Sequence, residues 1–490
     1  MTLSSRFVRT ACLITLLFAA GTFVRGDGAS WPANVRVNQD HDGNPQAETS
    51  LAVDPRDPLH LVAVFWEVIS YDPQNTSNRQ KRVNWAWTRD GGQTWQSRRF
   101  ENGVYSSDPA IAADNAGNFY IETILVPNSP YDDGASIGIL KSTDGGETFV
   151  KTADVGLNRC MDKPFLTVDP VTGAVYVVWI DFAPKRAPNA VRIFFSMSVD
   201  HGDTFTPPRQ ISAANAFGSF PTATIGPAGE VYVAWATSWY RQMVWLARSL
   251  DGGRTWELKA LKDSALSSAG DHSGDGALWA TVDVDRSGGP HHGRIYMAWI
   301  RYATGKGSTV DVAWSDDRGD HWSEPVRADG DTNPGDFHVL AWVVVDGSGR
   351  VCVTYRLLRP DPAGFLQAEY LAVSTDGGAR FGPNVRVSEG ITVFHRFNSD
   401  YDQPAAVGNR LHAIWTDARL GDNDIFTQNV NLDDFDEDGI LNDGDLDGEY
   451  ADHPCTGGAI DHCDDNCPGT PNADQADADN DGIGDACEAG

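Results

Sequence analysis

Residues 142–149 read STDGGETF, and close copies of this octapeptide recur along the chain. Each copy has Ser or Thr two places before an Asp, Gly two places after that Asp, and Trp or Phe five places after it. The other copies are TRDGGQTW at 88, SVDHGDTF at 198, SLDGGRTW at 249, SDDRGDHW at 315 and STDGGARF at 374. Their aspartates, at positions 90, 144, 200, 251, 317 and 376, are 51 to 66 residues apart. This spacing indicates a repeated supersecondary unit.

The octapeptide has the composition of a tight corner between two strands. Its Asp can accept hydrogen bonds from backbone N–H groups of the turn, and its Gly can adopt a positive φ without steric cost. The aromatic residue then returns the chain to a hydrophobic layer. Strand-like runs flank the copies, such as VNWAW at 83–87 and ELKAL at 257–261.

A second pair of apolar runs, separated by an Asp/Gly/Pro turn, precedes each octapeptide, so each repeat contains four strands. A seventh pair, QPAAVGNRLHAIW at 403–415, follows the last copy, and DIFTQNVN at 424–431 gives it a third strand. Its missing outer strand can come from the N-terminus, because ANVRVNQ at 33–39 resembles the outer-strand run PNVRVS at 383–388. Such closure removes an open sheet edge.

Four-stranded units at this spacing are typical of β-propeller blades. The predicted fold is therefore all-β, with seven blades favoured over six and a small loop-rich region after them. We expect the propeller to span residues 30–432 and the C-terminal region to span 433–490.

The octapeptides resemble the Asp boxes, or BNR repeats, of the sialidase superfamily, over roughly residues 30–432. In that family the boxes lie at the outer rim between third and fourth strands, away from the substrate. The resemblance therefore implies a propeller fold and a carbohydrate or glycoprotein ligand, but it does not by itself imply catalysis.

Residues 1–26 have the pattern of a secretory signal peptide, with Arg6 and Arg9 ahead of the apolar run ACLITLLFAAGTFV. This run is shorter than the roughly 20 apolar residues that span a bilayer. No later stretch is long and apolar enough to do so. We expect a secreted or cell-surface protein without a membrane span; its oligomeric state stays open.

Much of the formal net charge of −30 is in the C-terminal region. Residues 433–490 contain 19 of the 68 acidic residues and no Lys or Arg. The rest of the chain is also acidic, which argues against a nucleic-acid partner.

Aspartates in this region stand at alternate positions before glycines, as in DFDEDG at 434–439 and DGDLDG at 443–448. Alternating carboxylates suit a hard cation that takes six to eight oxygen ligands. The run CDDNCPGTPNADQADADNDGIGDAC at 463–487 resembles a thrombospondin type 3 repeat, which implies bound calcium. The expected ligands are Asp434, Asp436, Asp438, Asp443, Asp445, Asp447, Asp477, Asp479, Asp481 and Asp485.

Four of the seven cysteines, at positions 455, 463, 467 and 487, are in the same region. In an exported segment they favour two disulfides, for which three connectivities are possible. Cys352, within VCVTY, is expected to be a buried free thiol.

A propeller usually binds small ligands at one end of its axis, so the loops before first strands and after second strands supply the candidate site residues. Before first strands lie Asp108, Asp162 and Asp402. After second strands lie Glu67, Asp181, Arg301, Arg356, Asp417 and Arg419. Neighbouring aromatic residues that could stack on sugars are Trp239, Tyr240, Tyr302 and Tyr401.

Sialidases cleave with a tyrosine nucleophile, and the resemblance implies an arginine triad, a Tyr/Glu pair and an acid/base Asp. The corresponding candidates are Tyr401, Asp402, Glu67, Arg301, Arg356 and Arg419. The Arg-Ile-Pro signature expected ahead of the first Asp box is absent. Two functions therefore stay open: an exo-sialidase-type glycoside hydrolase, and a non-catalytic propeller that binds glycans or proteins. In the second case the candidate acids and arginines would cap loops or form structural ion pairs.

Overall fold

The structure is a computed structural model of the 490-residue chain. It describes residues 33–40, 43–70, 80–101, 105–126, 135–156, 161–182, 191–213, 219–236, 243–261, 279–302, 307–330, 333, 335–362, 364–382, 384–393, 399–445, 450 and 452–488. The predicted signal peptide, residues 1–26, lies outside this part of the chain.

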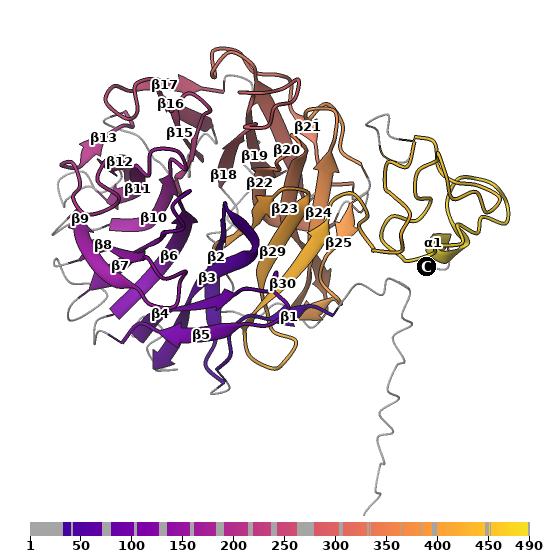
Figure 1. Ribbon diagram of the computed structural model, residues 1–490, viewed down its shortest axis with the longest axis horizontal. Coiled ribbons are helices and arrows are strands. Elements are labelled where there is room, and N and C mark those ends of the chain that lie inside the picture. Colours follow the sequence, from indigo (N-terminus) through magenta and orange to yellow (C-terminus); the bar gives the residue numbers. More distant parts are fainter. Residues whose placement is uncertain are drawn as a thin grey trace, which may run out of the picture.

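The described strands form seven sheets arranged in a ring (Figure 1). The fold is a seven-bladed β-propeller, as predicted, and the six-bladed alternative is wrong. Neighbouring blades contact each other through their first strands, which line the axis. Blades 1 to 6 consist of antiparallel hairpins, in the order in which their strands follow one another along the chain, and blade 7 takes its outer strand from the N-terminus.

The strands of the first four blades run in sequence order. Blade 1 contains β2 (Gln46–Asp54), β3 (Asp57–Ser70), β4 (Gln80–Thr88) and β5 (Gln96–Arg99). Blade 2 contains β6 (Tyr105–Ala113), β7 (Phe119–Val126), β8 (Ser136–Ser142) and β9 (Val150–Val155). Blade 3 contains β10 (Met161–Val168), β11 (Val175–Phe182), β12 (Val191–Ser198) and β13 (Arg209–Gln210). Blade 4 contains β14 (Thr222–Ile225), β15 (Val231–Ala236), β16 (Val244–Ser249) and β17 (Glu257–Ala260).

The last three blades complete the ring. Blade 5 contains β18 (Ala280–Val284), β19 (Ile295–Tyr302), β20 (Ser308–Ser315) and β21 (Val326–Arg327). Blade 6 contains β22 (Phe337–Val345), β23 (Val351–Asp361), β24 (Gly364–Ser374) and β25 (Val385–Arg386), and β26 (Thr392–Val393) also pairs with β24. Blade 7 contains β28 (Ala405–Val407), β29 (Arg410–Asp417), β30 (Asp424–Asn431) and, from the N-terminus, β1 (Val35–Arg36). The short β27 (Asp402–Gln403) pairs in parallel with β2 of blade 1.

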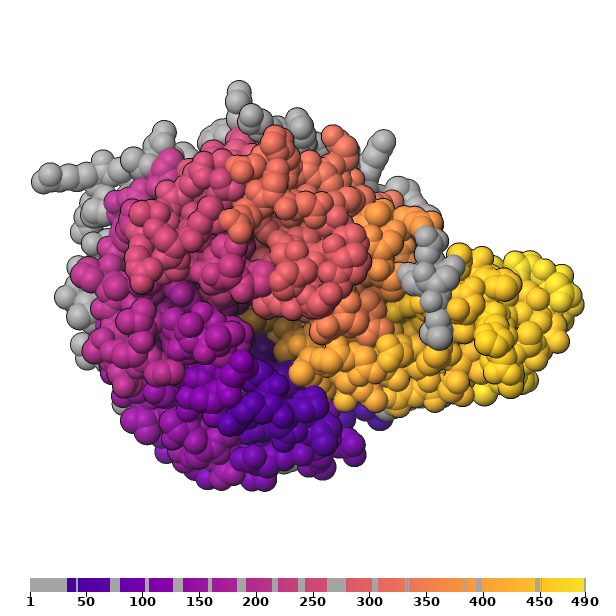
Figure 2. Space-filling model, turned by 45° about the horizontal axis from the view of Figure 1, so that its top comes forward, coloured from indigo at the N-terminus to yellow at the C-terminus, as the bar shows by residue number. Residues whose placement is uncertain are grey.

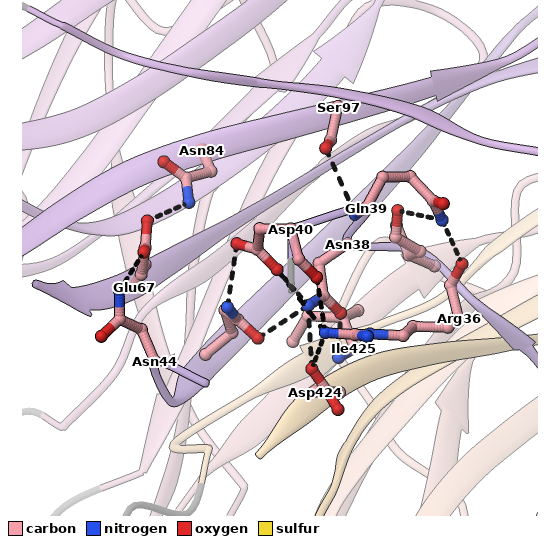
Figure 3. Close-up of polar contacts among 12 residues, drawn as sticks. Arg36, Asn38, Gln39, Asp40, Asn44, Glu67, Asn84, Ser97, Asp424 and Ile425 are labelled. Carbon is pink, nitrogen blue, oxygen red and sulfur yellow. Dashed lines mark hydrogen bonds and ion pairs between the residues drawn. The ribbon is translucent and has the colours of Figure 1, made fainter. Parts of the chain in front are cut away.

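The N-terminal strand closes the ring, as the sequence predicts. Val35 pairs with Thr427 in β30, and Arg36 forms an ion pair of 2.6 Å with Asp424. The Asn38 amide donates to the same carboxylate at 2.9 Å (Figure 3). Blade 7 is thus made from both ends of the propeller, and β1 covers the edge that β30 would otherwise expose.

Each octapeptide forms the corner after the third strand of its blade, and its Asp makes the predicted hydrogen bonds. In every copy the Asp accepts a backbone N–H from four residues further on: from Thr94 to Asp90 at 2.9 Å, Thr148 to Asp144 at 3.0 Å, Thr204 to Asp200 at 2.8 Å, Thr255 to Asp251 at 2.7 Å, His321 to Asp317 at 2.8 Å and Arg380 to Asp376 at 3.0 Å. The positive φ of Gly146, 82°, shows why glycine is needed at the second position after the Asp. The corner is therefore a tight turn that is stabilised by hydrogen bonds among its own residues.

The C-terminal region forms a separate lobe beside blades 6 and 7 (Figures 1 and 2). Disulfides join Cys455 to Cys463 and Cys467 to Cys487, which selects one of the three possible connectivities. The short helix α1 (Asp485–Glu488) ends the described chain. Cys352 is buried and free, as predicted. Across the described residues, no helix has the length and apolarity needed to cross a bilayer.

Candidate functional site

The first strands of four blades share a β-bulge that bends them next to the axis. In each, one non-glycine residue has a left-handed φ: Glu48 at 54°, Asp108 at 49°, Lys163 at 45° and Leu340 at 57°. Such residues cost about 1 to 3 kcal/mol each and are concentrated at functional sites, where bulges redirect side chains. Three of these four positions carry charged groups, which marks this end of the axis as the candidate site.

The redirected side chains meet around one lysine. Lys163 Nζ lies 3.2 Å from Asp108 Oδ1 and 3.8 Å from Glu48 Oε1, and it also forms an ion pair with Asp400. Asp162 precedes Lys163 on β10 and interacts with it electrostatically. We call these five residues, Glu48, Asp108, Asp162, Lys163 and Asp400, the axial cluster. It brings together blades 1, 2, 3 and the segment that enters blade 7.

The carboxylates of the axial cluster do not share one protonation behaviour. Burial opposes ionisation of Asp108, but the ammonium groups of Lys163 and Lys81 outweigh it and lower its pKa to about 2. Burial dominates at Asp162 and raises its pKa to about 6. Burial, together with the charge of Asp108, also raises the pKa of Glu48 above its ordinary value. Asp108 is therefore an ionised acceptor at neutral pH, whereas Asp162 carries a proton only below about pH 6.

An aromatic plug fills the axis beside the cluster. It consists of rings from blades 3 to 6 and from the segment before β27: Phe165, Phe220, Trp279, Trp342 and Tyr401. Phe220 stacks on Trp279 at a centroid distance of 4.2 Å and on Tyr401 at 5.2 Å. The Tyr401 side chain is only 1% exposed, and its hydroxyl donates to the Pro109 carbonyl at 2.8 Å.

Tyr401, Asp402 and Arg356, three of the predicted catalytic residues, lie together. Arg356 is 1% exposed, forms an ion pair with Asp402 and reaches Glu369 Oε2 at 3.4 Å. The single guanidinium of Arg356 lies between two buried carboxylates, Asp402 and Glu369. Burial therefore dominates at Glu369 and raises its pKa to about 8. Burial also raises the pKa of Tyr401 well above its ordinary value, which is the opposite of what an activated nucleophile needs.

The other three predicted catalytic residues occupy separate ion pairs. Glu67 is fully buried and accepts a hydrogen bond from Arg82 at 2.9 Å. It also accepts hydrogen bonds from the amides of Asn44 and Asn84, each at 2.7 Å (Figure 3). Arg301 binds Asp311 at 2.7 Å, and Arg419 binds Asp417 and Glu389. Arg301, Arg356 and Arg419 are thus each paired with different carboxylates.

The Glu67–Arg82 ion pair has a counterpart at the same position of blade 3. Glu67 faces Arg82 across β3 and β4, and Asp181 faces Arg192 across β11 and β12, where the side chains are 3.3 Å apart. In blade 6 Arg356 faces Glu369 one residue nearer to the corner, and therefore on the other face of the sheet. This recurrence favours a structural role, in which each pair neutralises buried charges at the end of a hairpin.

A cavity of about 530 Å³ lies beside Glu67, on blade 1. Its lining includes Asp40, Asn84 and Arg99, and Arg99 is 3.4 Å from Glu67.

Three of the predicted residues, Trp239, Tyr240 and Asp447, lie outside the described residues. The same is true of the Tyr302 side chain.

Glu48, Lys163 and Asp400, which form much of the axial cluster, were not predicted from the sequence. In the structure Asp108 and Lys163 occupy the same bulge position, each before a proline, whereas Asp162 corresponds to Ser107. A charged residue precedes a proline in both repeats, as Asp108-Pro109 and Lys163-Pro164. This similarity was the sequence signal for their equivalent positions.

The C-terminal region contains three groups of carboxylates that could hold a metal ion. Within each group, ligand oxygens lie within 4.8 Å of one another: Asp434, Asp436 and Asp438; Asp443, Asp445 and Asp464; Asp477, Asp479 and Asp481. Asp464 was not predicted. Asp485 is outside these groups and accepts the Ala478 N–H at 2.7 Å.

Some of these carboxylate oxygens are buried without a hydrogen-bond partner. They include Asp434 Oδ1, Asp436 Oδ2, Asp477 Oδ1 and Oδ2 of the neighbouring Asp465. Burial, followed by the charges of Asp465 and Asp438, raises the pKa of Asp436 to about 8. Buried, unpartnered carboxylate oxygens at this spacing fit a hard cation with oxygen ligands.

No protein-family model and no curated protein matches this chain. Among solved structures, it resembles an α-L-arabinanase of Penicillium chrysogenum complexed with arabinobiose, with a TM-score of 0.45 and 15% identity over 66% of this chain and 94% of that chain. It also resembles a leech intramolecular trans-sialidase, with a TM-score of 0.46 and 12% identity over 69% and 68%. A Hadza microbial sialidase gives a TM-score of 0.43 and 16% identity over 74% and 75%. At these values the similarities assign neither a family nor an activity to this chain.

Proposed function

We propose that this chain is a carbohydrate-directed propeller that binds sugar at the axial cluster. The observation that carries the proposal is the meeting of Glu48, Asp108 and Lys163, three left-handed bulge residues from three blades, around one ion-pair centre. Backbone strain and perturbed pKa values gathered at one end of a propeller axis are typical of a ligand site.

The chemistry of the cluster suits sugar hydroxyl groups, which both donate and accept hydrogen bonds. Ionised Asp108 can accept, Lys163 can donate, and Asp162 can donate below about pH 6, where it is protonated. The side chains of Lys163 and Asp400 are 13% and 22% exposed, so the cluster is reachable from solvent. The aromatic plug provides a rigid floor and not a stacking surface, because Tyr401 is buried.

Glycoside hydrolysis is the second candidate function. The pKa values of about 2 for Asp108 and about 6 for Asp162 differ in the way that separates a base from an acid in two-carboxylate glycosidases. In such a reaction Asp162 would protonate the leaving oxygen and Asp108 would act as base or nucleophile. An exo-sialidase mechanism through Tyr401 remains a further hypothesis, and the burial of its hydroxyl speaks against it.

A glycan panel, scored for both binding and release of sugar, tests these functions. We expect Lys163→Met to weaken binding at least about tenfold, the scale of a lost charge-assisted hydrogen bond. Lys151→Met is the matched control, because Lys151 belongs to an exposed pair with Asp154. Turnover that Asp162→Asn abolishes would select hydrolysis. Equal affinities of both lysine variants for every bound glycan would remove the axial cluster as the site.

We further propose that the C-terminal region binds calcium through its three acidic groups. The unpartnered oxygens of Asp434, Asp436 and Asp477 support the first and third groups. When bound, the cation would neutralise the clustered carboxylates, which otherwise repel one another. The two disulfides, in turn, favour an oxidising compartment and support secretion.

Calorimetric titration of the full chain measures this binding. We expect calcium to bind at several sites, with affinity reduced by Asp436→Asn and by Asp479→Asn, one in each of two groups. Chelation should make the region more sensitive to protease although its disulfides remain. An absence of calcium uptake at millimolar concentration would contradict the proposal.

A further inference from the structure

The C-terminal region begins where blade 7 would carry an Asp-box corner. In blade 2 the third strand ends at Ser142, whose hydroxyl accepts the Asp144 N–H at 3.4 Å. In blade 7 the third strand ends at Asn431, whose side-chain oxygen accepts the Asp433 N–H at 3.3 Å. The residues Asn431-Leu432-Asp433 thus start the same turn and then continue into the first acidic loop.

The start of the C-terminal region also replaces an Asp-box corner in its contacts with the preceding blade. In blade 5, Arg294 Nη1 donates to the carbonyl of Gly377, in the corner of blade 6, at 2.8 Å. In blade 6, Arg350 Nη1 donates to the Leu432 carbonyl at 3.0 Å and to Asp433 at 2.5 Å. Arginines at the same place in two blades therefore bind an Asp-box corner in one case and the start of the C-terminal region in the other.

The first acidic loop also enters the propeller core. Phe435 is 1% exposed and packs in one hydrophobic cluster with side chains of blades 6 and 7, including Cys352 and Leu411. Tyr450 packs edge-on against Phe435 and donates to the Leu432 carbonyl at 2.9 Å. On the outside, Glu437 forms a 3.1 Å ion pair with Arg410 of β29.

Phe435 stands between Asp434 and Asp436 in the sequence, so the core contact and the carboxylates share one short loop. The oxygens Asp434 Oδ1 and Asp436 Oδ2 are buried without partners. Without a cation, repulsion among the carboxylates of this loop opposes the conformation that inserts Phe435.

We propose that the first acidic loop, residues 433–439, is a cation-dependent corner of blade 7. Cation binding to this loop stabilises the last strands of the propeller as well as the C-terminal lobe. The inference rests on the proposed calcium binding and adds to it that the ring itself is stabilised by the ion.

The third acidic loop, residues 477–482, provides a matched control in the same chain. Gly482 N–H donates to Asp477 at 3.1 Å, as Gly439 N–H donates to Asp434 at 3.1 Å. Where the first loop has buried Phe435, the third has Ala478, which is exposed. The two loops therefore share this backbone hydrogen bond, but only the first loop packs a large apolar side chain against the propeller.

Hydrogen exchange of the full-length protein, followed by mass spectrometry, tests the inference. At a calcium concentration of about one hundred times Kd, the protection of β29 and β30 should exceed that of chelated protein by roughly a hundredfold, the linkage factor for one ion that binds only the folded form. Asp436→Asn should remove most of this dependence. Asp479→Asn should remove a comparable amount of calcium uptake and leave the protection of β29 and β30 unchanged.

Phe435→Leu supplies a variant with all its carboxylates intact. We expect it to retain calcium uptake but to reduce the calcium dependence of β29 and β30 protection about tenfold, because the coupling contact is weakened. Calcium uptake with protection of β29 and β30 that does not respond to the ion would overturn this inference alone. Absence of calcium uptake would instead overturn the binding proposal on which it rests.

Discussion

Lys163 Nζ and Asp108 Oδ1 lie 3.2 Å apart in the propeller axis, although they are 55 residues apart in the sequence. Both residues have a left-handed φ in a bulged first strand, and both precede a proline. The repeat thus places a cation and an anion at the same position of adjacent blades. Each buried charge in the cluster is therefore stabilised by the opposite charges around it.

Removing the cation should destabilise the protein. Lys163→Met leaves buried Asp108 without its main counter-charge and Glu48 with Lys81 alone, so we expect a loss of about 3 to 5 kcal/mol in the free energy of unfolding at neutral pH. Urea unfolding measures this loss, and the exposed residue Lys151, changed to Met, should cost less than about 1 kcal/mol. Similar losses for the two variants would contradict a buried charge network.

The raised pKa of Asp162 predicts a pH dependence. Its folded-state pKa is about 6, above the unfolded value of about 3.9, so the folded state binds the proton more tightly. The stability that this provides is complete below about pH 4 and is lost as the pH rises through about 6. Asp162→Asn should therefore become more stable relative to wild type between pH 4 and pH 7.5, by about 2 kcal/mol.

Chemical unfolding across this pH range checks the prediction. The control is Asp203→Asn, at a side chain that is 62% exposed, and its difference from wild type should stay nearly constant. A stability difference for Asp162→Asn that is equally flat would show that folding does not raise the pKa of Asp162.

The corner aspartates should contribute to stability and not to ligand binding. Asp144 accepts hydrogen bonds from Thr148 N–H at 3.0 Å and from the Ser142 hydroxyl at 2.7 Å. Asp144→Ala should lower the free energy of unfolding by about 1 to 2 kcal/mol, while Glu147→Ala, in the same corner, should cost less than about 0.5 kcal/mol. Thermal unfolding gives both values; a loss of glycan binding by well-folded Asp144→Ala would refute a purely structural corner.

Tyr401→Phe separates a structural tyrosine from a nucleophile. The substitution removes the hydrogen bond to the Pro109 carbonyl and should cost about 1 kcal/mol of stability, with glycan affinity unchanged. A fall of at least about a hundredfold in sialoside turnover, measured on folded protein, would instead establish Tyr401 as a catalytic group.

Much of the fold could be predicted because its determinants are local. The hydrogen bonds of each octapeptide stay within a few residues, so the motif predicts its own corner wherever it occurs. The number of blades and the closure of blade 7 followed from counting strand pairs and from the similarity of residues 33–39 to residues 383–388. The two tail disulfides were predicted, but their pairing was not, because four cysteines within a short segment permit several pairings.

The sequence by itself determined the repeat, the propeller and the acidic loops, since these depend on the residue types within short windows. Only the tertiary structure decided which charges meet. The axial cluster forms because bulges turn Glu48, Asp108 and Lys163 toward one axis, and the sequence pattern of a strand does not show where its partner strand skips a residue. In the same way, Phe435 is within an acidic stretch by sequence, yet it is buried against side chains of blades 6 and 7.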